Sequence, residues 1–345
     1  MKKLIPRLLL LLIPIAFYYF IVYFTDPFNV FHYDNVRETG AANNSNYIKT
    51  RYVVENPDKY NAFVVGSSRV ANIPESNLPK KIGEIPLKWY NLETAMASVK
   101  DGEEAIKTLL ENGVDVRYIV LGIDEVSMWR TYEQSCSELM SMPYQKYEEN
   151  PVKFLYQYLK VKPKVEQLVK VLNQSEYDME NTKLFYEYGV QIPNLDTSMP
   201  KEYGQPLNNS LGCEEYISSD ISKECIVAIT DIIEMCRENN IELVVYTSPI
   251  HGSTYKEATE KGYFDFLVDV SKVTNFYNFS GLNKYTTDQA YYFDNSHFRP
   301  CVGLEMEKVM FSSNMTSDVS SFGAYITTEN AGELVQYLMG QLQNN

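Results

Sequence analysis

Histidine and cysteine are both scarce in this chain of 345 residues. The three histidines are His32, His251 and His297, so a reaction that needs an imidazole must use one of them. The five cysteines include no CxxC pair, which gives a zinc ribbon no support, and they are too few for a disulfide scaffold. The composition calls for no metal ion and no other cofactor.

Positive charge is scarce as well, because 31 Lys and Arg residues stand against 45 Asp and Glu residues, a formal net charge of −14. Nucleic acids and anionic lipids bind surfaces on which positive charge displaces counterions. We therefore expect no nucleic-acid partner, and an anionic polymer would have to bind in a local groove. Apolar residues at 45% and charged residues at 22% are ordinary for a folded globular protein.

One long apolar run, Leu8 to Phe24, follows three basic residues near the amino terminus. As a helix it would be about 25 Å long, enough for a short membrane crossing. The run does not end in a small-residue cleavage site, which favours an uncleaved anchor over a secretory signal peptide. The basic flank places the amino terminus inside. The sequence predicts a single-pass cell-membrane protein, anchored in the membrane by residues 1–25, with an extracytoplasmic domain.

An extracytoplasmic location would permit disulfide bonds. Cys213 and Cys225 could pair across a short loop. Five unpaired thiols fit the sequence equally well, because connectivity cannot be read from spacing alone.

The rest of the chain alternates between short apolar runs and amphipathic helical patterns. Residues 26–60 are polar and rich in Asn and Tyr, which we interpret as a juxtamembrane stalk before a domain at 61–345. The expected strands are 61–65, 116–122, 241–246, 274–278 as the last one, and more weakly 89–92. The expected helices are 101–110, 222–239, 254–270, 302–311 and 329–342. This order predicts an α/β domain with a parallel sheet and right-handed crossovers.

A long tyrosine-rich insertion, at about 126–220, separates the two halves of this pattern. It contains helical stretches such as Pro151 to Leu159. Insertions of this size in α/β domains form caps over active sites or are inert decoration.

Polar residues stand at the ends of several predicted strands. Gly66-Ser67-Ser68, Gly122-Ile123-Asp124 and Thr247-Ser248-Pro249 each follow an apolar run, and Asp294-x-x-His297 precedes a helix. Parallel sheets bind ligands at the carboxyl ends of their strands. A serine becomes a nucleophile when an imidazole takes its proton, and a carboxylate orients that imidazole. Each motif alone is more often a turn or a helix cap, but together they predict acyl transfer.

Two blocks of the sequence resemble the SGNH (GDSL-like) hydrolase superfamily. They are Val64-Val65-Gly66-Ser67-Ser68-Arg69 and Phe293-Asp294-Asn295-Ser296-His297-Phe298, the second followed by Gly303 and a helix. The resemblance covers residues 60 to 312 outside the insertion. Within this superfamily, the chain resembles the membrane-anchored branch that includes DltD-like and alginate O-acetylation-like proteins.

The resemblance implies a three-layer α/β/α, flavodoxin-like fold and a catalytic set of Ser68, His297 and Asp294. Ser68, rather than Ser67, would be the nucleophile. It also implies a membrane-bound O-acyltransferase as partner and a cell-envelope glycan or teichoic-type polymer as substrate.

The chain departs from the family pattern at the oxyanion site. The stretch 91–98 lacks the family's glycine, and Asp124 stands where an amide would donate to the oxyanion. An ionised Asp124 would repel that charge, so we expect it to serve positioning. The expected donors are the backbone N–H groups of Ser68 and of the segment Ala95, Met96, Ala97 and Ser98.

Three further residues are candidates for substrate contact. Arg69 follows the nucleophile, although a surface residue at a helix start that makes an ion pair is the more common explanation. Asn91 belongs to the second block. His251 follows the strand 241–246, where an ordinary loop hydrogen bond is the alternative. We expect no function for His32.

The sequence therefore predicts extracytoplasmic, serine-dependent acyl transfer or ester hydrolysis. The alternative is a catalytically degenerate SGNH domain that acts as a glycan-binding or scaffold subunit. A third possibility is a free esterase that needs no partner.

Overall fold

A mostly parallel sheet forms the centre of the molecule. The structure is a computed structural model that describes residues 4–173, 176–190, 197–198, 214–217, 223–312 and 315–343. The described strands are ordered β4 (Trp89–Thr94), β1 (Ala62–Ser67), β5 (Tyr118–Ile123), β6 (Glu242–Thr247), β7 (Phe276–Asn278) and β8 (Ala324–Ile326). All neighbouring pairs are parallel except β7 and β8. The expected α/β fold with a mainly parallel sheet is confirmed.

An apolar core covers each face of this sheet. Successive side chains of a strand point to opposite sides, so each strand contributes to both cores. In β1, Phe63 and Val65 join one apolar core, while Ala62 and Val64 join the other. The first core also receives α3 (Val99–Glu111), α9 (Glu224–Glu238), α11 (Tyr263–Val273) and α13 (Ala331–Gln343). The second core receives α12 (Pro300–Met310). Strands buried on both faces explain the near-continuous apolar runs in the sequence.

The order of the strands places the carboxyl ends of β1 and β5 side by side at the middle of the sheet. The chain leaves β1, passes through the short hairpin β2 (Lys81–Ile82) and β3 (Ile85–Pro86), and forms β4 on one side of β1. It then crosses through α3 to β5 on the other side of β1. Connections therefore diverge between the carboxyl ends of β1 and β5, the position at which such sheets bind ligands.

Two elements of the carboxyl half differ from the sequence prediction. The helix expected at 254–270 is broken into α10 (Gly252–Glu260) and α11. Gly262 lies between them at φ 94°, and a Cβ there would stand 2.6 Å from the carbonyl oxygen of Tyr216, so glycine is required. The strand expected to be last, β7, is followed by β8, which pairs with it in antiparallel register.

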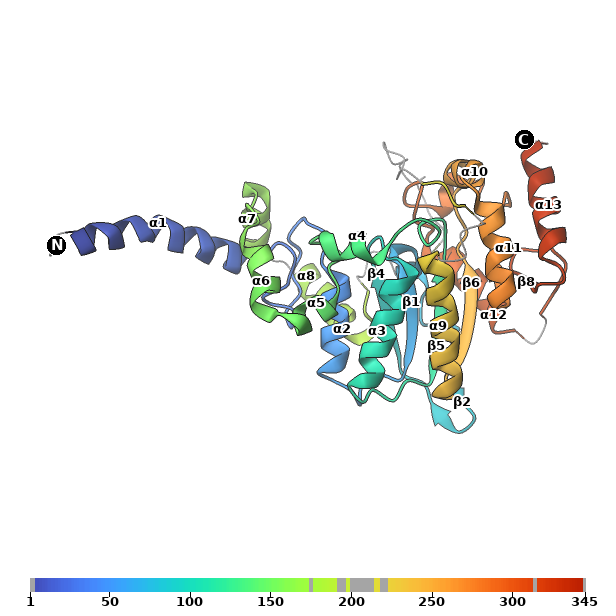
Figure 1. Cartoon of the computed structure of the whole chain (residues 1–345), viewed down its shortest axis with the longest axis horizontal. Coiled ribbons are helices and arrows are strands. Elements are labelled where there is room, and N and C mark those ends of the chain that lie inside the picture. Colours follow the sequence, from blue (N-terminus) through green and yellow to red (C-terminus); the bar gives the residue numbers. More distant parts are fainter. Residues whose placement is uncertain are drawn as a thin grey trace.

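The amino-terminal apolar run forms α1 (Leu4–Thr25), which extends away from the rest of the molecule (Figure 1). Among the described residues, no helix combines the length and apolar character needed to cross a membrane. This finding contradicts the predicted single-pass membrane localisation. The carboxyl-terminal part of α1 instead contacts later helices, and Tyr18 Oη donates to the carbonyl oxygen of Val161 at 3.1 Å.

Residues 26–60 are packed against the domain, which corrects their interpretation as a stalk. They contain α2 (Ser45–Val54), which contacts α3 and β4. Asn46 Nδ2 donates to Asp101 Oδ1 at 3.0 Å, and Lys49 Nζ forms an ion pair with Glu93 Oε1 at 2.8 Å. The sequence predicts a stalk here because the segment is rich in polar residues, but in the structure several of these side chains are buried with polar partners.

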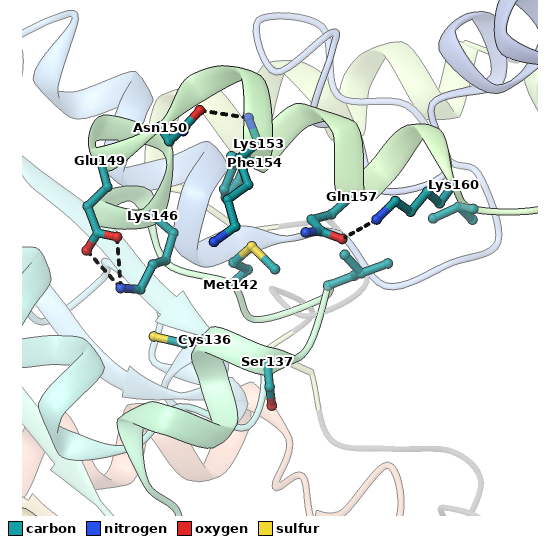
Figure 2. Close-up of a pocket in the computed structure, with 12 residues that line it drawn as sticks. Cys136, Ser137, Met142, Lys146, Glu149, Asn150, Lys153, Phe154, Gln157 and Lys160 are labelled. Carbon is teal, nitrogen blue, oxygen red and sulfur yellow. Dashed lines mark hydrogen bonds and ion pairs between the residues drawn. The ribbon is translucent and has the colours of Figure 1, made fainter.

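The chain between β5 and α9 contains several short helices. These are α4 (Tyr132–Ser137), α5 (Tyr144–Glu149), α6 (Pro151–Leu159), α7 (Val165–Leu172) and α8 (Glu176–Tyr188). Residues of α4, α5, α6 and the adjoining loops line a cavity of about 750 Å³, into which Lys146, Lys153 and Lys160 project (Figure 2). Cys213 lies outside the described residues, and Cys225 in α9 is a buried free thiol.

Helix α12 packs closely against the turn that follows β1. This turn is the 3₁₀ helix η1 (Ser68–Asn72). A Cβ at Gly303 of α12 would stand 2.3 Å from the carbonyl oxygen of Asn72 and 3.0 Å from Pro74 Cδ. Further along α12, Glu307 Oε2 accepts a hydrogen bond from the backbone N–H of Asn77 at 3.0 Å. The helix therefore holds both the turn and the segment after it.

We expect Gly303→Ala to lower the free energy of unfolding by at least about 1–3 kcal/mol, because backbone cannot yield to the added methyl group. Urea unfolding measures this change. The control is Gly340→Ala in α13, where a Cβ meets nothing within 4 Å. It should be neutral or stabilise by up to about 1 kcal/mol. Equal effects of the two substitutions would contradict the close approach.

Glu307 predicts a pH dependence of stability. Burial raises the pKa of this carboxyl from 4.5 to about 8. Between these values the unfolded chain releases the proton while the folded protein keeps it, so stability falls as the pH rises. The wild type should therefore lose a few kcal/mol relative to Glu307→Gln between pH 5 and pH 8. Urea unfolding at both values measures this difference, and Glu305→Gln, on the exposed side of α12, should show none.

Candidate active site

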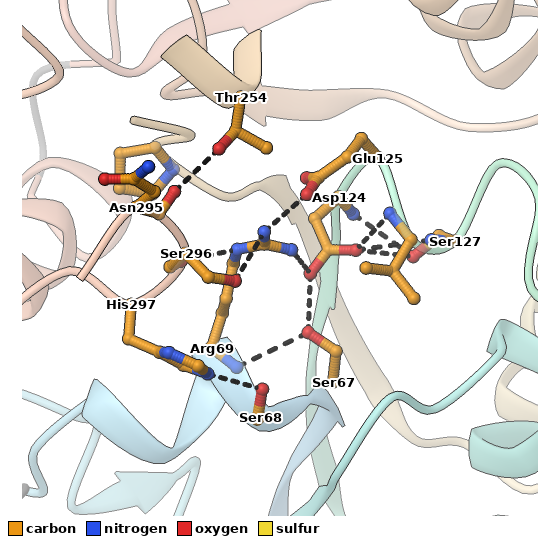
Figure 3. Close-up of polar contacts among 12 residues, drawn as sticks. Ser67, Ser68, Arg69, Asp124, Glu125, Ser127, Thr254, Asn295, Ser296 and His297 are labelled. Atoms are coloured by element: carbon orange, nitrogen blue, oxygen red, sulfur yellow. Dashed lines mark hydrogen bonds and ion pairs between the residues drawn. The ribbon is translucent and has the colours of Figure 1, made fainter. Parts of the chain in front are cut away.

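The structure brings Ser68, His297 and Asp294 into one hydrogen-bonded chain. Ser68 Oγ lies 2.8 Å from His297 Nε2. His297 Nδ1 lies 3.0 Å from Asp294 Oδ1 and 2.9 Å from Oδ2. Ser68 is the first residue of η1, directly after β1, and the other two residues lie in the loop before α12 (Figure 3 shows Ser68 and His297). The two sequence blocks therefore meet as predicted, although they are 229 positions apart.

The loop before α12 is shaped by the carboxylate that it carries. Asp294 Oδ1 accepts the backbone N–H groups of Ser296 at 2.7 Å and of His297 at 2.8 Å. Burial acts to raise the pKa of Asp294, but its hydrogen bonds and the charge of His297 outweigh burial and lower the pKa. The side chain therefore remains a carboxylate that can orient the ring.

A cavity of about 290 Å³ opens beside these residues. It is lined by Ser68, Ala71, Asn72, Glu93, Phe293, Asp294 and His297. The serine and imidazole thus have space beside them for a ligand.

Arg69 is buried beneath the site, with 1% of its surface exposed. Its guanidinium forms ion pairs with Asp124, at 2.8 Å, and with Glu125, and it donates to Ser296 O at 2.7 Å and Ser296 Oγ at 2.9 Å (Figure 3). The predicted contact of Arg69 with substrate is therefore wrong, because every face of the group is turned to these partners. Arg69 instead ties the loop of His297 to the ends of β1 and β5.

Asp124 has no free part that could face the cavity. One oxygen accepts from Ser67 Oγ at 2.5 Å and pairs with Arg69, and the other accepts from the backbone N–H groups of Val126 and Ser127 at 2.9 and 3.2 Å. The carboxylate is 1% exposed and does not line the cavity of Ser68. This arrangement supports a positioning role, and it holds the hydroxyl of Ser67 away from His297.

The segment 95–98 does not supply the expected oxyanion donors. Three of its N–H groups are already used: Ala95 donates to Ser45 Oγ at 3.4 Å, Ala97 to Thr94 O at 3.2 Å, and Ser98 to Asp101 Oδ2 at 2.8 Å. Met96 has a left-handed backbone, at φ 54°, and does not line the cavity of Ser68. The N–H group of Ser98 is used in this way because Ser98 and Asp101 form the capping box that begins α3.

Asn91 and His251 are also occupied by structural contacts. Asn91 is fully buried, and its side chain donates to Val70 O at 2.8 Å and accepts from Glu93 N at 3.0 Å. A substrate cannot reach it. His251 caps α10 through Ser253, and burial lowers the pKa of its ring. It is not among the residues that line the cavity of Ser68.

Sequence reasoning missed Glu93 and Lys49. Glu93 lines the Ser68 cavity and also a neighbouring cavity of about 150 Å³, which includes Phe185 and Val190 from the insertion. Lys49 of α2 is 1% exposed and pairs with Glu93, and burial lowers its pKa. Nothing in the sequence marked Lys49, because its partner comes from a different element 44 positions away.

Two comparisons, with models of known families and with curated proteins, add no relative to this description. No model of a known family matches the chain, and no curated protein matches it.

We expect Arg69→Met to lower the free energy of unfolding by about 3–5 kcal/mol, because it leaves two buried carboxylates without their cation. Arg117→Met is the matched control, since Arg117 pairs with Asp115 near the surface, at 2.6 Å. Its effect should stay within about 1 kcal/mol. Urea unfolding of both variants measures the difference, and an equally small effect at Arg69 would contradict its structural role.

Proposed function

We propose that the protein is an SGNH-type enzyme that carries out serine-dependent acyl transfer or ester hydrolysis. The observation that supports this most directly is the chain Ser68–His297–Asp294, with separations of 2.8 and 2.9 Å. These are hydrogen-bonding distances, so the imidazole can take the serine proton without rearrangement. The same three residues also carry the sequence resemblance.

The proposed reaction has two steps. In the first, Ser68 Oγ attacks the acyl carbonyl carbon while its proton passes to His297 Nε2. The proton then goes to the leaving oxygen, the bond to that oxygen breaks, and the acyl group remains on Ser68. In the second step, water or an acceptor hydroxyl gives its proton to His297 Nε2 and attacks the acyl carbon. The bond between that carbon and Ser68 Oγ then breaks, and His297 returns the proton to Ser68 Oγ. Asp294 keeps the ring oriented and stabilises its charged form.

The topology of the sheet gives independent support. Without the β2–β3 hairpin, the parallel strands follow the order 2-1-3-4-5 that flavodoxin-like three-layer folds use. Ser68 follows the first of these strands, at the point where connections diverge. The resemblance extends the proposal to a cell-envelope glycan or teichoic-type polymer as acceptor and to a membrane-bound O-acyltransferase as the partner that supplies the acyl group.

A second candidate function is a degenerate SGNH domain that binds a glycan or serves as a scaffold. The observation that favours it is the state of the expected oxyanion site. Asp124 and three N–H groups of 95–98 are occupied by other partners. A domain that cannot stabilise an oxyanion would keep the geometry of the three residues without useful turnover.

A fluorophosphonate probe tests the enzyme proposal, because it reacts with activated serines. We expect the folded wild type to be labelled at Ser68, and Ser68→Ala to lose labelling. His297→Gln should slow labelling by at least about 10³-fold, since the serine then lacks its base. Mass spectrometry of the labelled peptide and the time course of labelling measure both effects.

Ser67→Ala is the matched control for this experiment. The hydroxyl of Ser67 donates to Asp124 rather than to His297, so the variant should still be labelled at Ser68. A folded wild type that resists the probe would contradict the enzyme proposal and favour the degenerate domain.

A further inference from the structure

Asn72 places a buried amide without a partner beside the candidate nucleophile. It is the last residue of η1, four positions after Ser68, and both residues line the same cavity. The side chain is 2% exposed, and its Oδ1 is fully enclosed with no hydrogen-bond partner. Among the described residues, its Nδ2 donates to no protein group either.

Such an amide is unusual in a folded protein. Most buried polar side chains have at least one partner, because burial removes the hydrogen bonds that water would provide. The other buried asparagine near the site, Asn91, uses both ends of its amide within the protein. An unpaired amide that faces a cavity is therefore available to a ligand. A half rotation of the amide exchanges its oxygen and nitrogen at almost no change in shape, so either can face the ligand.

We propose that the Nδ2 group of Asn72 is an oxyanion donor of the site, together with the backbone N–H of Ser68. This inference rests on the proposed function. When Ser68 Oγ bonds to the acyl carbon, the carbonyl electron pair moves onto oxygen, and Asn72 donates a hydrogen bond to that oxygen. The bond strengthens as the charge develops, and it returns to its earlier strength when the carbonyl re-forms and the leaving oxygen departs with the proton from His297.

The two acidic side chains in and near the cavity cannot perform this task in place of Asn72. Asp124 is committed to Arg69 and Ser67, and Glu93, which also lines the cavity, carries negative charge and is paired with Lys49. Neither carboxylate can donate to an oxyanion.

The turn is also held in place, as an oxyanion donor requires. The carbonyl oxygen of Asn72 lies against Gly303 of α12, and Asn77 is held by Glu307 of the same helix. A donor that is fixed before the reaction pays no cost of reorganisation when charge appears. Nucleophile and donor are carried by one short turn, so their separation is set by η1 itself.

The experiment compares hydrolysis of p-nitrophenyl acetate by the full-length wild type, Ser68→Ala and Asn72→Ala. We expect Asn72→Ala to lower kcat by about 10²–10³-fold with little change in KM, because the donor acts on the charged intermediate more than on the bound ester. Thermal unfolding of each variant shows whether it remains folded. A folded Asn72→Ala with kcat within about threefold of the wild type would overturn the inference.

Asn72→Asp keeps the shape of the side chain and serves where Asn72→Ala fails to fold. Its carboxylate should repel the oxyanion and lower kcat at pH 8 at least as strongly as the alanine variant does. A rate like that of the wild type would overturn the inference. Failure of the proposed function is distinguishable, because the wild type itself would then turn over no faster than Ser68→Ala.

Discussion

The buried guanidinium of Arg69 is the constraint on which the candidate site depends. Three segments that are distant in sequence converge on it: the turn after β1, the end of β5 and the loop that carries His297. A buried cation without carboxylate partners would be strongly destabilising, so these segments must be assembled together. The short distance between Ser68 and His297 is a result of that assembly.

Two adjacent serines have different tasks in this arrangement. Ser67, the last residue of β1, turns its hydroxyl to Asp124 inside the sheet end, while Ser68 turns its hydroxyl to His297. The division coincides with the end of the strand, because Ser67 is still extended whereas Ser68 begins the 3₁₀ helix η1. Asp124 therefore stabilises the scaffold under the candidate nucleophile, and its negative charge is balanced by Arg69 instead of facing the cavity.

The sequence predicted the elements whose evidence is local. Buried strands appear as short apolar runs that stop at polar residues, so β1, β5 and β6 and the position of Ser68 at a strand end could be predicted. Burial of polar residues could not. Arg69 resembled a surface cation because its partners Glu125 and Ser296 are 56 and 227 positions away. The apolar run at the amino terminus likewise gave no sign that α6 and α7 contact its end.

Helix α12 connects the two halves of the candidate site mechanically. It starts three residues after His297, and its Gly303 lies against the turn that begins with Ser68. Both the loop that carries the imidazole and the turn that carries the serine are therefore joined to the same helix. The hydrogen bond between the serine hydroxyl and the imidazole therefore depends on a backbone contact that lies outside the cavity.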